Sequence, residues 1–204
     1  MVRTVRPMAE LSLPHEADAG PTKPEVRAVA LAKLAVRPTD HVAEVGACTG
    51  AVTVELARRA ATVTALERDP ERIDAARGNL AANNYDADVT LREAEAPDGL
   101  PEDADALFLG GSRNAEAVLD RAVEMGVERI VMNVCRIETA AKAIEAFRSR
   151  DLLAEAIQLQ VNRGYDLAGK TGLSAENPVY VIVGRGAGSG DELAGSEAAE
   201  GNEP

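Results

Sequence analysis

The sequence predicts an α/β fold in which a mostly parallel sheet of seven strands carries helices on both faces and ends in an antiparallel hairpin. The first supporting observation is that short apolar runs alternate with segments of helical periodicity from residue 21 to about residue 150. Strands and helices that alternate in this way form parallel sheets. The second is that the last two apolar runs have no helical pattern between them, which favours an antiparallel pair.

The predicted helices begin at residues that suit a helix N-terminus. Thr22 can cap the first helix, and Pro24 has the fixed φ that suits a first turn. Asp69 and Pro70 form a second such start. Helices are expected over residues 21–36, 51–60, 69–83, 114–125 and 138–150.

The predicted strands are short aliphatic runs, as expected for a chain with 46% hydrophobic but only 2% aromatic residues. Strands are expected over residues 41–46, 62–67, 88–96, 104–111, 128–134, 154–163 and 177–184. We expect a loop of about fifteen residues to join the last two.

The 204 residues are enough for one domain with a sizeable core. Residues 1–19 show no clear periodicity and are expected to be an N-terminal extension. Residues 20–185 are expected to form the domain. Residues 186–204 are rich in glycine, serine and glutamate, and we expect this acidic tail to be disordered.

The chain is strongly acidic, with 34 acidic against 22 basic residues and a net charge of −12. Such a surface repels nucleic acid and keeps a protein soluble in concentrated salt, which indicates a salt-adapted organism. No apolar run approaches the length of about 18 residues that a membrane helix requires, and no signal-peptide pattern is seen. We therefore expect no nucleic-acid or membrane partner and a cytoplasmic location.

Residues that support metal or hydrolytic chemistry are scarce. The chain has two cysteines, Cys48 and Cys135, and two histidines, His15 and His41. These do not make a disulfide framework or a zinc site, and a Ser-His-Asp arrangement is not expected. We therefore expect no metal.

Ligands of open parallel sheets bind outside the carboxyl ends of the strands, near the point where strand order reverses. This rule nominates the turns near residues 46–50, 67–69, 94–97, 110–113 and 133–137. The first of them consists of Gly46, Ala47, Cys48, Thr49 and Gly50. The spacing of the glycines in this turn, and the acid Glu44 two residues before the first of them, differ from the G-x-G-x-x-G motif of dinucleotide-binding sites. The turn resembles the first motif of the Rossmann-like class I methyltransferases, which implies S-adenosylmethionine as the cofactor.

Two further strand ends carry residues that a nucleoside needs. Glu67 ends the second predicted strand, 21 residues after Gly46, where an acid can accept both ribose hydroxyls. Glu95 and Ala96 end the third, where this class places an acid and a backbone amide at the adenine. Each signal alone is weak, but three of them at the correct strand ends indicate a nucleoside cofactor.

A narrower resemblance extends over about residues 20–184. The segments that carry it are GPTKPEVRAVALAKLAVRPTDHVAEVGACTGAVTVELA, EAEAP, LFLGGS, IET and ENPVYVIVG. They resemble the decarboxylating C15-methyltransferases of cobalamin biosynthesis, which act on precorrin-6B. The resemblance implies cofactor contacts at Thr22, Gly46 to Gly50, Glu67 and Ala96. It also implies methylation of C15 with loss of the C12 acetate as carbon dioxide, a homotetramer and, in the archaeal members, a cobalt-containing substrate.

Cys48 stands where this class usually has the middle glycine of the turn. The motif that would surround a cysteine nucleophile is absent, so we do not expect covalent chemistry there. We expect a negative φ at this position, so that a small side chain fits while Gly46 and Gly50 allow close approach to the ligand. Glu67 and Glu95 replace the usual aspartates but keep the charge.

Methyl transfer from a sulfonium needs alignment more than acid or base chemistry, so no residue is assigned as catalytic. A tetrapyrrole carries many carboxylates, which an acidic protein repels at long range and which arginines bind through forked contacts. The candidate substrate ligands near the predicted cleft are Arg113, Arg136, Arg163 and Lys170. Each of them can equally be part of an ordinary surface ion pair.

Two alternatives remain open at this point. A methyltransferase of similar fold could act on tRNA or on isoaspartyl peptides, although the acidic composition weakens the tRNA alternative. A non-catalytic nucleoside-binding domain could retain the fold with a decayed turn at Cys48. Binding of S-adenosylmethionine separates this last alternative from the enzymes.

Overall fold

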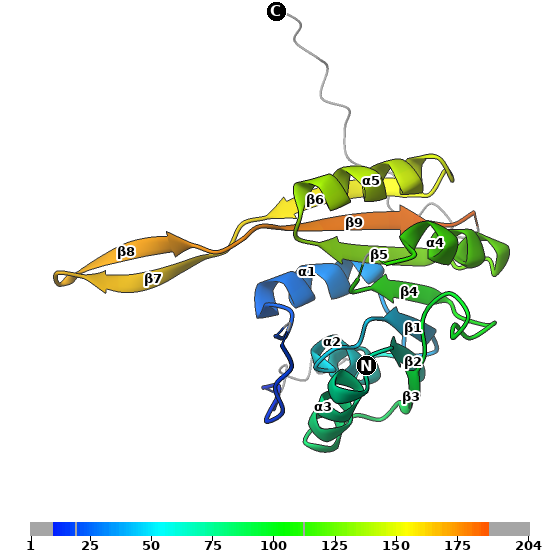
Figure 1. Cartoon of the computed structure of the whole chain (residues 1–204), viewed down its shortest axis with the longest axis horizontal. Helices are drawn as coiled ribbons and strands as arrows, with labels where there is room; N and C mark the ends of the chain where they lie inside the picture. The colour runs from blue at the N-terminus through cyan, green and yellow to red at the C-terminus, as the bar shows by residue number, and fades with distance from the viewer. Residues whose placement is uncertain (1–9, 19, 112, 188–204) are drawn as a thin grey trace, which may run out of the picture.

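The computed structural model describes residues 10–18, 20–111 and 113–187 (Figure 1). The helices are α1 (Pro24–Leu34), α2 (Ala51–Ala57), α3 (Pro70–Ala81), α4 (Ala115–Glu124) and α5 (Ile137–Arg148). The strands are β1 (His41–Val45), β2 (Thr62–Glu67), β3 (Asp88–Glu93), β4 (Ala106–Leu109), β5 (Arg129–Val134), β6 (Leu153–Leu159), β7 (Asn162–Leu167), β8 (Lys170–Ala175) and β9 (Val179–Arg185). Most of the predicted disordered tail and the first half of the predicted extension lie outside the described residues.

Seven strands form one sheet in the order β3-β2-β1-β4-β5-β9-β6, which confirms the predicted fold class. Strands β1 to β5 run parallel to one another, and β9 runs antiparallel between β5 and β6. Strand order reverses between β1 and β4, so a crevice opens at their carboxyl ends.

Helices cover both faces of this sheet. On one face α1 and α2 bury Leu34 and Leu56 together with Phe108 of β4. On the other face α4 and α5 bury Leu119 and Phe147. All four residues of β4 are buried, as expected of a central strand with helices on both sides.

The first helix has Pro24 in its first turn, as predicted, but it begins three residues later than expected and Thr22 does not cap it. Lys23 is the N-cap residue and makes no side-chain capping bond. The Thr22 carbonyl instead accepts a hydrogen bond from the guanidinium of Arg27. The helix ends at Leu34, and its C-cap residue Ala35 adopts the left-handed conformation with a φ of 52°.

The predicted loop between the last two strands is wrong, because residues 162–175 form a separate two-stranded sheet, β7–β8, that projects from the body (Figure 1). Its turn consists of Ala168 and Gly169, with φ of 51° and 77°, the signs that a type I′ hairpin turn requires. Every residue of β7 is exposed. The hairpin therefore lacks the apolar alternation by which a strand is recognised in a sequence.

Candidate functional site

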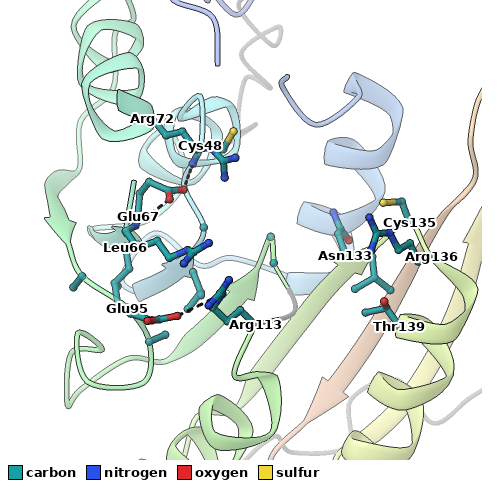
Figure 2. Close-up of a pocket in the computed structure, with 18 residues that line it drawn as sticks. Cys48, Leu66, Glu67, Arg72, Glu95, Arg113, Asn133, Cys135, Arg136 and Thr139 are labelled. Atoms are coloured by element: carbon teal, nitrogen blue, oxygen red, sulfur yellow. Dashed lines mark hydrogen bonds and ion pairs between the residues drawn. The ribbon is translucent and has the colours of Figure 1, made fainter. Parts of the chain in front are cut away.

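A cavity of about 660 Å³ opens at the carboxyl ends of the parallel strands (Figure 2). All five turns that the topology rule nominates contribute residues to its lining. The cavity lies at the reversal of strand order, where open parallel sheets bind their ligands.

The turn between β1 and α2 owes its shape to two glycines. Gly46 has a φ of 85° and Gly50 a φ of 74°, in the left-handed region that favours glycine. A Cβ on Gly50 would lie 3.2 Å from the backbone of Ala76, so glycine allows α3 to pack closely. The amides of Gly46 and Ala47 both donate to the Leu66 carbonyl, at 2.8 and 3.0 Å, which joins the turn to β2.

The prediction of a negative φ at Cys48 is wrong: the φ is 50°, where a cysteine is disfavoured by about 1–2 kcal/mol. Its amide donates to Oε2 of Glu67 at 3.0 Å, and this bond holds the turn in that conformation. The thiol contacts the pocket, and burial raises its pKa. A thiol that stays protonated is a poor nucleophile, in line with the absence of a surrounding catalytic motif.

Glu67 at the end of β2 is buried, and three backbone amides fix its carboxylate. Oε2 accepts from Cys48, and Oε1 accepts from Arg68 at 2.9 Å and from Asp69 at 3.1 Å. A carboxylate has about four lone-pair sites, so one on Oε2 remains for a ligand in the pocket that Glu67 lines.

Glu95 and Arg113 lie together on one side of the cavity (Figure 2), and Ala96, the residue after Glu95, also lines it. Oε1 of Glu95 is 3.6 Å from Nε of Arg113, and both side chains are largely exposed. Asn114 donates through Nδ2 to the Ala96 carbonyl at 3.1 Å, which fixes this turn against the start of α4. The turns after β3 and β4 thus bring an acidic and a basic side chain to the same side of the pocket, and the backbone of the first turn is anchored.

The opposite wall comes from β5 and α5 and is largely polar: Asn133, Cys135, Arg136 and Thr139 (Figure 2). The side-chain nitrogen and oxygen of Asn133 are buried and have no hydrogen-bond partner in the described part of the chain. Sequence reasoning named Arg136 but missed Asn133, Thr139 and Arg72 of α3, which also lines the cavity. For Asn133, its place in a nominated turn was the available signal.

Several predicted site residues do not line the cavity: Thr22, Ala47, Thr49, Gly50, Arg163 and Lys170. Arg163, on β7, donates to Glu25 at 2.6 and 2.9 Å and to Glu176 at 3.0 Å. Hydrogen bonding to Arg163 lowers the pKa of Glu25 to about 2. Lys170 begins β8 beside the tip of the projecting hairpin (Figure 1). Arg163 and Lys170 therefore lie on the hairpin outside the cavity lining, although both were expected near the cleft.

Glu44 of β1 is 1% exposed and does not line the pocket. Its Oε2 has no hydrogen-bond partner among the described residues. Burial, with the nearby charge of Glu67 in the same direction, raises the pKa of Glu44 to about 8. The carboxyl is therefore neutral at pH 7.

Metal ligation and membrane insertion find no structural support in residues 10–18, 20–111 and 113–187. Histidine, cysteine and carboxylate side chains do not gather there in groups of three or more that could hold a metal ion. No helix in these ranges is long and apolar enough to cross a membrane.

The strand order, with β9 reversed beside β5, and the glycine turn that faces an acid at the end of β2 place the chain among the class I methyltransferases. The family model for the precorrin methyltransferase domain matches residues 14–185. The chain belongs to this family.

Relatives and a solved structure agree with this assignment. A protein of Halobacterium salinarum named "Probable cobalt-precorrin-6B C(15)-methyltransferase (decarboxylating)" is 60% identical over 181 residues, which are 89% of this chain and 97% of the relative. A relative of the same name from Methanosarcina acetivorans is 37% identical and covers 81% of this chain and 94% of its own length. The crystal structure of a precorrin 8W decarboxylase from Methanobacterium thermoautotrophicum matches with a TM-score of 0.76 and 30% identity, over 83% of this chain and 95% of that one.

Proposed function

We propose that the chain catalyses S-adenosylmethionine-dependent methylation of C15 of cobalt-precorrin-6B, with decarboxylation of the C12 acetate, in cobalamin biosynthesis. The observation that carries the proposal is the bond from the Cys48 amide to Glu67, which joins the glycine turn to the strand-end acid within one pocket. The 60% identical relative named for this reaction supports the choice of substrate. The net charge of −12 argues against tRNA.

The residues at β1, β2 and β3 suit the cofactor. Glu67 has an acceptor site left for a ribose hydroxyl, Gly46 allows close backbone approach, and Ala96 lies where the adenine would rest. We expect Thr22 and the remaining turn residues to shape this side of the pocket, as the family resemblance implies. Bound S-adenosylmethionine supplies an activated methyl group, so the chain has to align it with the substrate carbon and exclude water.

The β5 side of the pocket suits the tetrapyrrole. Arg136 offers a guanidinium group to its carboxylates, as Arg113 does from across the cavity, and the buried amide of Asn133 has donor and acceptor capacity free for a ligand. Loss of carbon dioxide from the C12 acetate leaves an electron pair on the former acetate carbon, which takes up a proton. A guanidinium on this wall would hold the departing carboxylate in place.

We expect Arg136→Ala to weaken tetrapyrrole binding by about 10- to 100-fold, because one charge-assisted contact is lost. Arg163→Ala is the matched control, since Arg163 is already bonded to Glu25 and Glu176 outside the pocket. Fluorescence titration of both variants with a carboxylated tetrapyrrole measures the difference. Equal affinities in the two variants would count against the assignment of the β5 wall.

We expect Cys48→Gly to bind S-adenosylmethionine as the natural chain does, because glycine adopts a φ of 50° without a Cβ penalty. Cys48→Trp, in contrast, would fill the pocket and abolish binding. Isothermal titration calorimetry on both variants, with circular dichroism as a control for folding, checks this pair. A Trp variant that still binds would contradict the placement of Cys48.

The reaction itself is tested by incubating the chain with cobalt-precorrin-6B and S-adenosylmethionine. Mass spectrometry should show the gain of one methyl group together with the loss of carbon dioxide. Methylation of tRNA or of an isoaspartyl peptide in its place would favour the alternative substrates. Absence of any cofactor binding by calorimetry would favour a non-catalytic domain.

We also propose a homotetramer in the cytoplasm, following the family resemblance. In support, three of the five large apolar side chains exposed among the described residues are on the β7–β8 hairpin: Tyr165, Leu167 and Leu173. Exposed apolar residues on a projecting arm are typical of an assembly surface. Light scattering from the purified chain measures the mass of the assembly directly.

A further inference from the structure

Residues 10–18, which we call the N-terminal strap, lie along α3. Asn83 lies just beyond the C-terminal end of that helix. Its Oδ1 accepts a hydrogen bond from the Ser12 amide at 3.1 Å, and its Nδ2 donates to the Ser12 carbonyl at 2.6 Å. Four residues earlier, Asn79 binds the amide and carbonyl of His15 in the same way, at 2.9 and 2.8 Å. Each asparagine thus offers a donor and an acceptor to one strap residue, much as a neighbouring strand would.

The strap then reaches the pocket. Arg72, which lines the cavity, donates through Nε and Nη2 to the carboxylate of Asp18 at 2.9 and 3.0 Å. Two residues after Asp18, the Gly20 carbonyl lies 3.9 Å from Sγ of Cys48, which also lines the cavity. The strap therefore runs from the C-terminal end of α3 to the rim of the cofactor side.

Asn79 also holds the glycine turn. Its side chain is 0% exposed, and its Nδ2 donates to the Thr49 carbonyl at 2.8 Å as well as to His15. Thr49 is buried, so water cannot readily replace this bond. One buried side chain thus joins the backbone of the strap to the backbone of the turn that carries Cys48.

We propose that Asn79 is a positioning residue for cofactor binding, which couples the seating of the N-terminal strap to the shape of the glycine turn. The inference rests on the proposed function in taking S-adenosylmethionine as the ligand. Coupling between two binding events is reciprocal. A bound cofactor must therefore hold the strap more tightly against α3, and a loosened strap must lower the affinity for the cofactor.

Three single variants test the coupling. Asn83→Ala releases the far end of the strap without touching the pocket or the turn. Asn79→Ala releases both strap and turn, and Asn84→Ala is the matched control, because it alters an exposed neighbour at the same end of α3. For each, calorimetry gives the affinity for S-adenosylmethionine, and the melting temperature reports stability. The rate of cleavage after the exposed Glu16 by a glutamate-specific protease, with and without the cofactor, reports the seating of the strap.

We expect the cofactor to slow cleavage at Glu16 of the natural chain about tenfold. Asn83→Ala should lower the affinity for S-adenosylmethionine by about five- to tenfold and speed cleavage at Glu16. Asn79→Ala should have both effects more strongly, and Asn84→Ala should change neither the affinity nor the cleavage rate. If Asn79→Ala does not fold, Asn83→Ala decides alone. Natural-chain affinity in Asn83→Ala, or cleavage that the cofactor does not slow, overturns the inference. A natural chain that binds no S-adenosylmethionine overturns the proposed function and the inference with it.

Discussion

Glu67→Gln is expected to lower the affinity for S-adenosylmethionine by about 100-fold. The carboxylate of Glu67 accepts hydrogen bonds from three backbone amides and has a further acceptor site open to the pocket. A glutamine keeps the shape but turns an NH2 group toward amides that need an acceptor. Each hydrogen bond to a charged group contributes about 1.5–3 kcal/mol, so loss of the charge affects both the turn and the ribose. Isothermal titration calorimetry measures the change.

Glu67→Asp is the control for this variant, because it keeps the charge and shortens the reach by one methylene. We expect it to retain affinity within about tenfold of the natural chain. Melting temperatures of both variants separate loss of the site from loss of the fold. A Gln variant that binds as tightly as the natural chain would remove Glu67 from the cofactor site.

Glu44→Gln is expected to change how stability depends on pH. With its pKa raised from 4.5 to about 8, the folded chain keeps a proton on Glu44 that the unfolded chain releases above pH 4.5. The contribution of this group to the free energy of unfolding is therefore fully present below pH 4.5. It falls by about 1.4 kcal/mol per pH unit between 4.5 and 8 and is constant above. A glutamine has no proton to lose, so the variant should lack this decline.

Urea unfolding of both proteins at pH 5 and pH 7 measures the effect. We expect the stability of the variant relative to the natural chain to rise by about 2–3 kcal/mol between these two values. Glu55→Gln is the control for replacing a buried glutamate. Glu55 of α2 is also buried, but unlike Glu44 it forms an ion pair, with Arg59 at 2.5 Å. Parallel pH profiles for Glu44→Gln and the natural chain would contradict a neutral Glu44.

The sequence predicted the central strands of the sheet closely. β2 has the predicted bounds, Thr62–Glu67, because five of its six residues are buried and a strand buried on both faces has little freedom in register. The β7–β8 hairpin was missed for the opposite reason, since its exposed residues follow no apolar pattern and its Ala-Gly turn is a weaker signal than Asn-Gly.

Prediction of the site depended on topology rather than on individual side chains. Parallel strands place their carboxyl ends at one edge, so the five turns had to meet at that edge once the strands were predicted to be parallel. Arg163 was misplaced because one of its partners, Glu25, lies 138 residues away in the sequence. The φ of Cys48 also could not be predicted, since it depends on the bond to Glu67 across the turn.

The three amides around Glu67 make recognition at this end of the pocket insensitive to ionic strength. At 1 M salt the Debye length is about 3 Å, so exposed charges such as Glu95 and Arg113 are largely screened from one another. Hydrogen bonds to a buried carboxylate are formed at contact, and mobile ions cannot enter between the atoms. The three amide bonds that hold Glu67 therefore persist at high salt, in a chain whose net charge of −12 suits concentrated salt.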